Sequence, residues 1–122
     1  MKIIEAINLV DDLIRNTYSQ DNKIKWLSNL DRVAKEVIDA HEGAENVDFN
    51  GYNSLTDLNI ELLIPEPYDE AYLRWMEAQI HYHNGEYDKY NNAAEAYGTI
   101  FEDFKKYYTR THMPKGKSIK FF

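Results

Sequence analysis

Residues 86–110 read EYDKYNNAAEAYGTIFEDFKKYYTR, and apolar or aromatic side chains return every three or four positions along them. Spacing of this kind places the side chains on one side of an α-helix. The sequence therefore predicts a helix over about residues 86–110, with an apolar seam that spans three heptads. The seam consists of Tyr87, Tyr90, Ala94, Tyr97, Phe101, Phe104 and Tyr108.

A second helix is predicted immediately before this one. Residues 65–70, PEPYDE, carry proline and acidic residues where a helix favours them, in its first turn, and Asn84-Gly85 ends the segment. Its apolar side chains cover more than one side, which is typical of a central helix or of one that faces both a core and a partner. They are Tyr72, Leu73, Trp75, Met76, Ile80 and Tyr82. With only Gly85 between them, the two segments predict a long aromatic helical hairpin.

Two further helices are predicted upstream, over about residues 2–17 and 21–43. Ile3, Ile7 and Val10 follow helical spacing, Asp21 is a favourable N-cap, and Gly43 is a typical helix terminator. The short connection between these helices favours an antiparallel pair. We therefore expect an all-α helical bundle, with a single domain over residues 1–114 and a tail over residues 115–122. We expect Tyr97, Phe101 and Phe104 to be buried with Leu30, Val37, Trp75 and Ile80.

Residues 44–64 have a different character. Asn50-Gly51 suits the positive φ angles of a type I′ turn, so a short β-hairpin is predicted around residues 47–55. A loop that turns back on itself is the alternative, because the flanking runs are short. Residues 58–64 are apolar enough for a strand or a final helical turn, and Pro65 ends either one.

Composition excludes several classes of protein. The 122 residues are 43% hydrophobic and 29% charged, which is typical of a globular chain. Because there is no cysteine, disulfides, zinc fingers and thiol catalysis are excluded. No apolar run approaches the ~20 residues of a membrane span, and no signal-peptide pattern opens the chain.

Charge is distributed unevenly within the net −7. The first 103 residues hold all 21 acids and eight of the 14 Lys and Arg residues, a balance of −13, whereas residues 104–122 carry six cations and no acid. An acidic body disfavours nucleic-acid binding. The basic end is suited to docking on another acidic body. For Lys105, Lys106 and Arg110, stabilisation of a helix C-terminus is the simpler interpretation.

No pattern for catalysis or metal binding is found. His81 and His83 point to different sides of a helix, while Glu77 and His81 share a side and are interpreted as a surface pair. The acidic groups lack the spacing of a calcium loop, and the serines lack a nucleophile motif. We therefore expect no enzymatic activity, no catalytic residue, no cofactor and no metal.

Residues 115–122, KGKSIKFF, end in two phenylalanines, although chain ends are usually polar. We expect this tail to dock on another copy of the chain, with folding back onto its own hairpin as the alternative. The predicted protein-interaction residues are Tyr72, Trp75, Met76, Lys115, Lys117, Ile119, Lys120, Phe121 and Phe122.

The segments LLIPEPYDE (residues 62–70), YLRW (72–75), NGEY (84–87) and YYTRTHMP (107–114) resemble uncharacterised prophage proteins of Gram-positive gut bacteria. The size and late aromatic helix are also similar to phage head–tail connector (adaptor) proteins. This resemblance implies a virion structural subunit that assembles into rings, with copies of itself and portal or tail components as partners. It implies a location in the host bacterial cytoplasm during assembly and then in the virion, with no membrane and no specific nucleic acid as partner. The alternative is a small cytoplasmic helical binding or regulatory module that captures a protein on its tyrosine-rich face.

Overall fold

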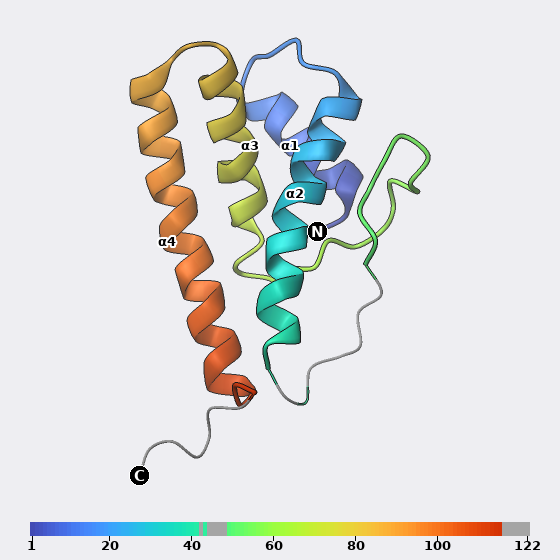
Figure 1. The fold of residues 1–122 in the computed structure, drawn as a ribbon. Coiled ribbons are helices and arrows are strands. Elements are labelled where there is room, and N and C mark those ends of the chain that lie inside the picture. Colours follow the sequence, from blue (N-terminus) through green and yellow to red (C-terminus); the bar gives the residue numbers. More distant parts are fainter. Residues whose placement is uncertain (42, 44–48, 116–122) are drawn as a thin grey trace.

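The computed structural model describes residues 1–41, 43 and 49–115, which form four α-helices (Figure 1). These are α1 (Ile3–Leu13), α2 (Gln20–Asp39), α3 (Glu70–His83) and α4 (Tyr87–Thr111). The expected all-α helical bundle is confirmed. No helix in the described part of the chain is long and apolar enough to cross a membrane.

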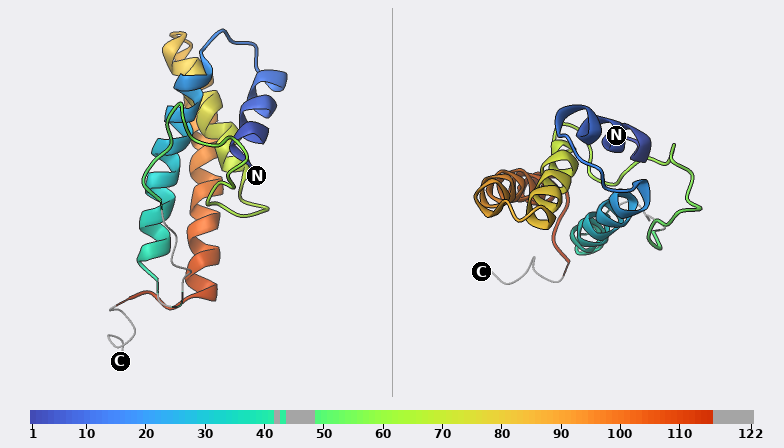
Figure 2. Two further views of the ribbon diagram at one scale, coloured as in Figure 1. Left: turned by 90° about the vertical axis from the view of Figure 1, so that its right-hand side faces the viewer. Right: turned by 90° about the horizontal axis from the view of Figure 1, so that it is seen from above.

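The helices pack around α3, as expected for a helix whose apolar side chains cover more than one side. α3 and α4 form the predicted antiparallel hairpin, and α1 and α2 lie on the other side of α3 (Figure 2). α1 rises from the N-terminus and α2 descends beside it, so this pair is also antiparallel (Figure 1). α2 and α4 therefore run in the same direction, with α3 between their upper halves.

The helix ends differ from the prediction at four places. α1 stops at Leu13, because Ile14 is extended with φ −132°. α2 begins earlier than expected, since Ser19 Oγ accepts the Asn22 amide at 3.1 Å, and it ends at Asp39, before Gly43. α3 begins at Glu70, because residues 65–69 form turns instead of a first helical turn.

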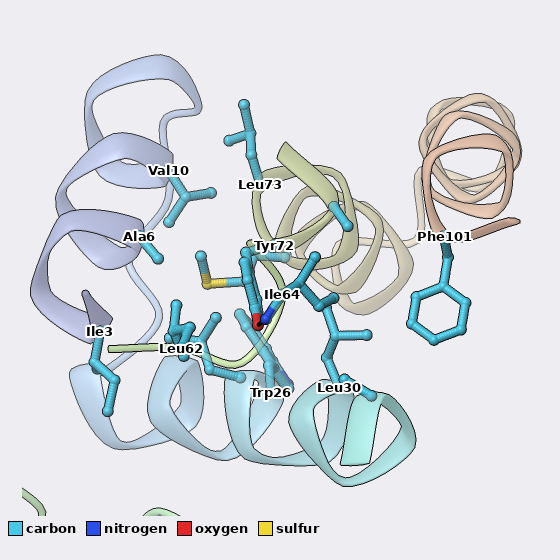
Figure 3. Close-up of a cluster of buried hydrophobic side chains, with 14 of the residues drawn as sticks. Ile3, Ala6, Val10, Trp26, Leu30, Leu62, Ile64, Tyr72, Leu73 and Phe101 are labelled. Atoms are coloured by element: carbon cyan, nitrogen blue, oxygen red, sulfur yellow. Dashed lines mark hydrogen bonds between the residues drawn. The ribbon is translucent and has the colours of Figure 1, made fainter. Parts of the chain in front are cut away.

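The hydrophobic core is one continuous cluster between α1, α2 and α3, and it continues onto one side of α4. Figure 3 shows Tyr72 and Ile64 at its centre, while Phe101 projects from α4 toward α2 at its margin. The burial predicted from the sequence is confirmed for Phe101, Phe104, Leu30 and Ile80, whereas three of the predicted residues are only partly buried. These three are Tyr97, Val37 and Trp75.

The residues of the predicted aromatic seam are buried in the C-terminal half of α4, but not at its start. Tyr87 is 61% exposed, and Ala93 is buried in place of the predicted Ala94. The first turn of α4 lies beside the last turn of α3, where the Tyr87 ring contacts the exposed ring of Tyr82 instead of the core. Burial raises the pKa of Tyr97, in the middle of the seam, to about 12.

Residues 49–64 contain no strand, so the predicted hairpin is absent from its described part, and residues 44–48 lie outside the described residues. Gly51 has φ +94° and passes so close to α2 that a Cβ would lie 3.3 Å from Ser28 Oγ. The next amide, of Tyr52, donates to that hydroxyl at 3.0 Å. Gly51 therefore serves a close approach to α2 in place of the predicted hairpin turn, and this part of the segment hydrogen-bonds to the helix.

The same segment caps the start of α1. The amides of Ile3 and Ile4 have no partner within the helix, and they donate to the carbonyls of Ile60 and Leu58 at 3.1 and 2.9 Å. A loop without secondary structure thus satisfies a helix terminus that has no favourable N-cap residue of its own.

Asp31 of α2 is the most deeply buried charged residue of the core. Its carboxylate accepts hydrogen bonds from the hydroxyls of Tyr52 and Tyr72, each at 2.5 Å, and from the Leu63 amide at 3.2 Å. The Tyr72 hydroxyl in turn accepts the Ile64 amide at 2.7 Å. This cluster joins α2, α3 and both ends of the 49–64 segment at one point.

Asp31→Ala is expected to lower the free energy of unfolding by about 3–5 kcal/mol, because one buried and two partly buried donors lose their acceptor together. Denaturant unfolding followed by circular dichroism measures the loss. Asp39→Ala on the same helix is the matched control: it removes only an exposed ion pair with Lys35, worth about 0.5 kcal/mol. Equal effects of the two substitutions would contradict a structural role for Asp31.

Burial raises the pKa of Asp31 above the 3.8 usual for aspartate, while the hydrogen bonds from Tyr52, Tyr72 and Leu63 each act in the opposite direction. The folded protein therefore holds this proton more tightly than the unfolded chain does. The associated stability is fully present below pH 3.8 and is lost as the pH rises through the folded pKa.

The Asp31→Asn variant has no titrating group at position 31. Its free energy of unfolding is therefore expected to lack the decrease that the Asp31 proton causes as the pH rises. The free energy of unfolding of both chains, measured by urea titration from pH 3 to 7, provides the comparison. The stability of the parent relative to Asp31→Asn should fall as the pH rises. An advantage of the parent that grew with pH would contradict the raised pKa.

Candidate functional site

A groove of about 860 Å³ runs between the lower halves of α2 and α4. Its floor is apolar and consists of Val33, Val37 and Phe101. Val33 is 43% exposed, although it continues the apolar side of α2. The groove exists because α2 and α4 extend below the first residue of α3, so no helix lies between them there (Figure 1).

The walls of the groove carry charges in a definite order. Glu102 lies near the upper end and Glu36 about halfway down, whereas Lys106 and Arg110 follow toward the lower end. Lys105 pairs with Glu102 at 2.8 Å, and this hydrogen bond lowers the pKa of Glu102. Lys106 and Arg110 have no ion-pair partner among the residues that the structure describes. They are therefore the cations available to a bound molecule.

His41 closes the lower end of the groove. Because the Val37 carbonyl can only accept, His41 Nδ1–H donates to it, at 2.7 Å, and Nε2 accepts from Thr109 Oγ1 at 3.2 Å. The imidazole also packs edge-on against Tyr108, with ring centroids 5.1 Å apart. From the sequence, His41 is placed only near a helix end, where a cation is favourable. In the structure its side chain ties the ends of α2 and α4 together.

The chain leaves α4 across this same end. Pro114 pairs with His41 in an isolated antiparallel bridge, and the Lys115 amide donates to the Ala40 carbonyl at 2.9 Å. Lys115, the last described residue, is exposed beside the mouth of the groove.

The structure separates the predicted interaction residues into three groups. Tyr72 and Met76 are fully buried, so they contact the core in place of the expected partner. Trp75 is partly buried: its indole N–H donates to the Trp26 carbonyl at 2.8 Å, and its ring lies 5.1 Å from that of Tyr97. Lys115 is exposed and does not line the groove, although its amide bonds to Ala40 at the lower end of it. The remaining predictions lie outside the described residues: Lys117, Ile119, Lys120, Phe121 and Phe122.

Exposed tyrosines gather at the other end of the molecule, around the turn from α3 to α4. Tyr82 is 52% exposed and its ring centroid lies 6.0 Å from that of Tyr87 and 5.3 Å from that of Tyr90. The sequence predicted a tyrosine-rich face but assigned Tyr87 and Tyr90 to the buried seam. These three residues form the tyrosine cluster.

The Glu77 and His81 pair is part of a larger charge cluster. His81 lies 3.8 Å from Glu77 and 3.1 Å from Glu86. The pKa of Glu86 falls to about 2, chiefly through its hydrogen bond with His81 and then through those with Asn84 and Lys89. Within the described residues, no three His, Asp or Glu side chains are arranged to hold a metal ion.

Comparisons of this chain with protein-family models, with curated proteins and with solved structures found no match. The groove and the tyrosine cluster are therefore interpreted from their own chemistry.

Thr109→Val is expected to lower the free energy of unfolding by about 0.5–1.5 kcal/mol, since His41 loses a hydrogen-bond donor where α2 and α4 meet. Thr99→Val, on the same helix, is the control, because the Thr99 hydroxyl is exposed and bonds only to the Glu95 carbonyl one turn earlier. Thermal unfolding of both variants measures the difference. Indistinguishable melting of the two would show that the His41–Thr109 contact contributes nothing.

Proposed function

We propose that this protein is a self-assembling structural subunit, and specifically a phage head–tail connector (adaptor) that forms rings. The observation that carries the proposal is the groove between α2 and α4. The described residues leave an apolar floor uncovered beside two available cations, at the point where the chain leaves the helical body. A surface of this kind is stabilised when a neighbouring copy covers it.

The resemblance of residues 62–70, 72–75, 84–87 and 107–114 to prophage proteins supports the more specific part of the proposal. A connector acts by contact, so its requirements are an interaction surface for the next copy and another for the portal or tail component. The groove and the tyrosine cluster lie at opposite ends of the α3–α4 hairpin and are suited to these two roles. Such a protein would act in the host cytoplasm during assembly and then in the virion.

The test is the mass of the purified protein, measured by light scattering over a wide range of concentration. The mass is expected to rise above the 14.4 kDa of one chain, and electron microscopy of the large species is expected to show closed rings. Added salt should weaken the association, because the available cations and the acidic body attract each other. A mass of 14.4 kDa at every concentration would contradict self-assembly.

The tyrosine cluster favours a second candidate function, a helical module that captures a different protein. Tyrosine is enriched at interfaces because its ring supplies apolar area while its hydroxyl stays hydrated. Self-association that depends on the groove, and is unchanged in Tyr82→Ser, would favour the connector. A chain that stays monomeric would favour the binding module.

A further inference from the structure

The groove between α2 and α4 has the size and the lining of a site for a small molecule. Its volume of about 860 Å³ lies within the range of about 300–1,000 Å³ that is usual for ligand sites. Such sites combine mostly apolar walls with a few polar groups that fix the orientation of the ligand. Here Val33, Val37 and Phe101 form the apolar floor, and cations of α4 are the polar groups. The groove is therefore suited to a ligand with an apolar body and a charged end.

The charged residues of the lining leave the groove with one more cation than acid. Lys105 and Glu102 neutralise each other in their ion pair at 2.8 Å. Lys106 and Arg110 remain on α4, and Glu36 on α2 is the other acid of the lining. Glu36, like these two cations, has no ion-pair partner within the described part of the chain. A ligand with a single negative charge would neutralise this surplus, whereas a cationic ligand would increase it.

The two available cations lie on the same wall of the groove, toward its lower end. Lys106 and Arg110 are four residues apart on α4, so they follow each other on one side of the helix, about 6 Å apart along its axis. His41 closes the groove at this end, and the apolar floor lies above it. A ligand that places its negative group between the cations therefore extends its apolar body upward over the floor.

We propose that the groove between α2 and α4 binds a small amphipathic anion, a monocarboxylate with an alkyl or aromatic body. The carboxylate accepts charge-assisted hydrogen bonds from Lys106 and Arg110, and the body covers Val33, Val37 and Phe101. The site is complete within a single chain, so the proposal goes beyond the proposed self-assembly and does not depend on it.

Three probes that share an alkyl chain and differ in their end group test the charge: octanoate, octanol and octyltrimethylammonium. Isothermal titration calorimetry with the full chain measures the dissociation constant of each. The net charge of −7 attracts the cationic probe in general, so a preference for octanoate would report the local charge of its site. Octanoate is expected to bind one to one and at least tenfold more tightly than octyltrimethylammonium. Absence of octanoate binding, or equal affinity for the two ions, would overturn the proposal.

A double variant, Lys106→Gln with Arg110→Gln, tests the two cations. It is expected to bind octanoate about tenfold more weakly than the parent and octanol equally well. The matched control is Arg15→Gln with Lys25→Gln, which removes the same two charges from exposed residues outside the groove. Circular dichroism verifies that both chains are folded. If the cations only stabilise the C-terminus of α4, both double variants bind octanoate equally well, and the proposal is wrong.

The valine side chains report where the ligand lies. In spectra of the valine methyl groups, octanoate is expected to shift the signals of Val33 and Val37 and to leave that of Val10, in the core beside α1, unchanged. Val33→Gln is expected to weaken octanoate and octanol alike by at least fivefold, whereas Leu55→Gln, at a 92% exposed position away from the groove, binds both as the parent does. Octanoate that binds without moving the Val33 and Val37 signals would lie elsewhere, and the proposal would fall.

The outcome for the ligand is separable from the outcome for self-assembly. If the chain is monomeric at every concentration and binds octanoate, this proposal stands and the proposed function fails. If the chain assembles through the groove, octanoate and the neighbouring copy compete for the same floor, so octanoate is expected to dissociate the assembly. An assembly that octanoate neither binds nor dissociates would overturn this proposal and leave the proposed function in place.

Discussion

The buried carboxylate of Asp31 is the constraint on which the rest of this structure depends. A charge taken out of water is stable only when its lone pairs are satisfied, and here two tyrosine hydroxyls and the Leu63 amide satisfy them. These donors come from α3 and from both ends of a segment without secondary structure. Because that segment also caps α1, one carboxylate sets the positions of three helices and the loop that joins them.

The same arrangement explains why the molecule is closed in its upper half and open in its lower half. α1 and α3 are short, and they surround the Asp31 cluster together with the upper part of α2. Beyond them α2 and α4 continue side by side, tied by His41 and Thr109 at the far end. The apolar side of α2 extends past the helices that could cover it, so Val33 and Val37 line a groove instead of a core.

The two exposed surfaces are chemically different, and this difference bears on function. The groove combines an apolar floor with charged walls, on which Lys106 and Arg110 have no ion-pair partner among the described residues. The tyrosine cluster presents rings around a helical turn, which suits a broader protein surface. A subunit that binds its neighbours through one end and another component through the other requires such an asymmetric distribution. α4 connects the two surfaces, since it runs from the tyrosine cluster to the lower end of the groove.

The sequence by itself determined the helices, because the periodic spacing of apolar residues is a local property: α4 was predicted at 86–110 and found at Tyr87–Thr111. It also determined the hairpin of α3 and α4 and most of the core. Only the tertiary structure decided the role of Asp31, which in the sequence resembles any surface acid, since its partners Tyr52 and Tyr72 are 21 and 41 residues away. The same holds for the groove and for the burial of Tyr72 and Met76. Periodicity tells which residues share a side of a helix, but the helix that covers that side is chosen by packing between distant segments.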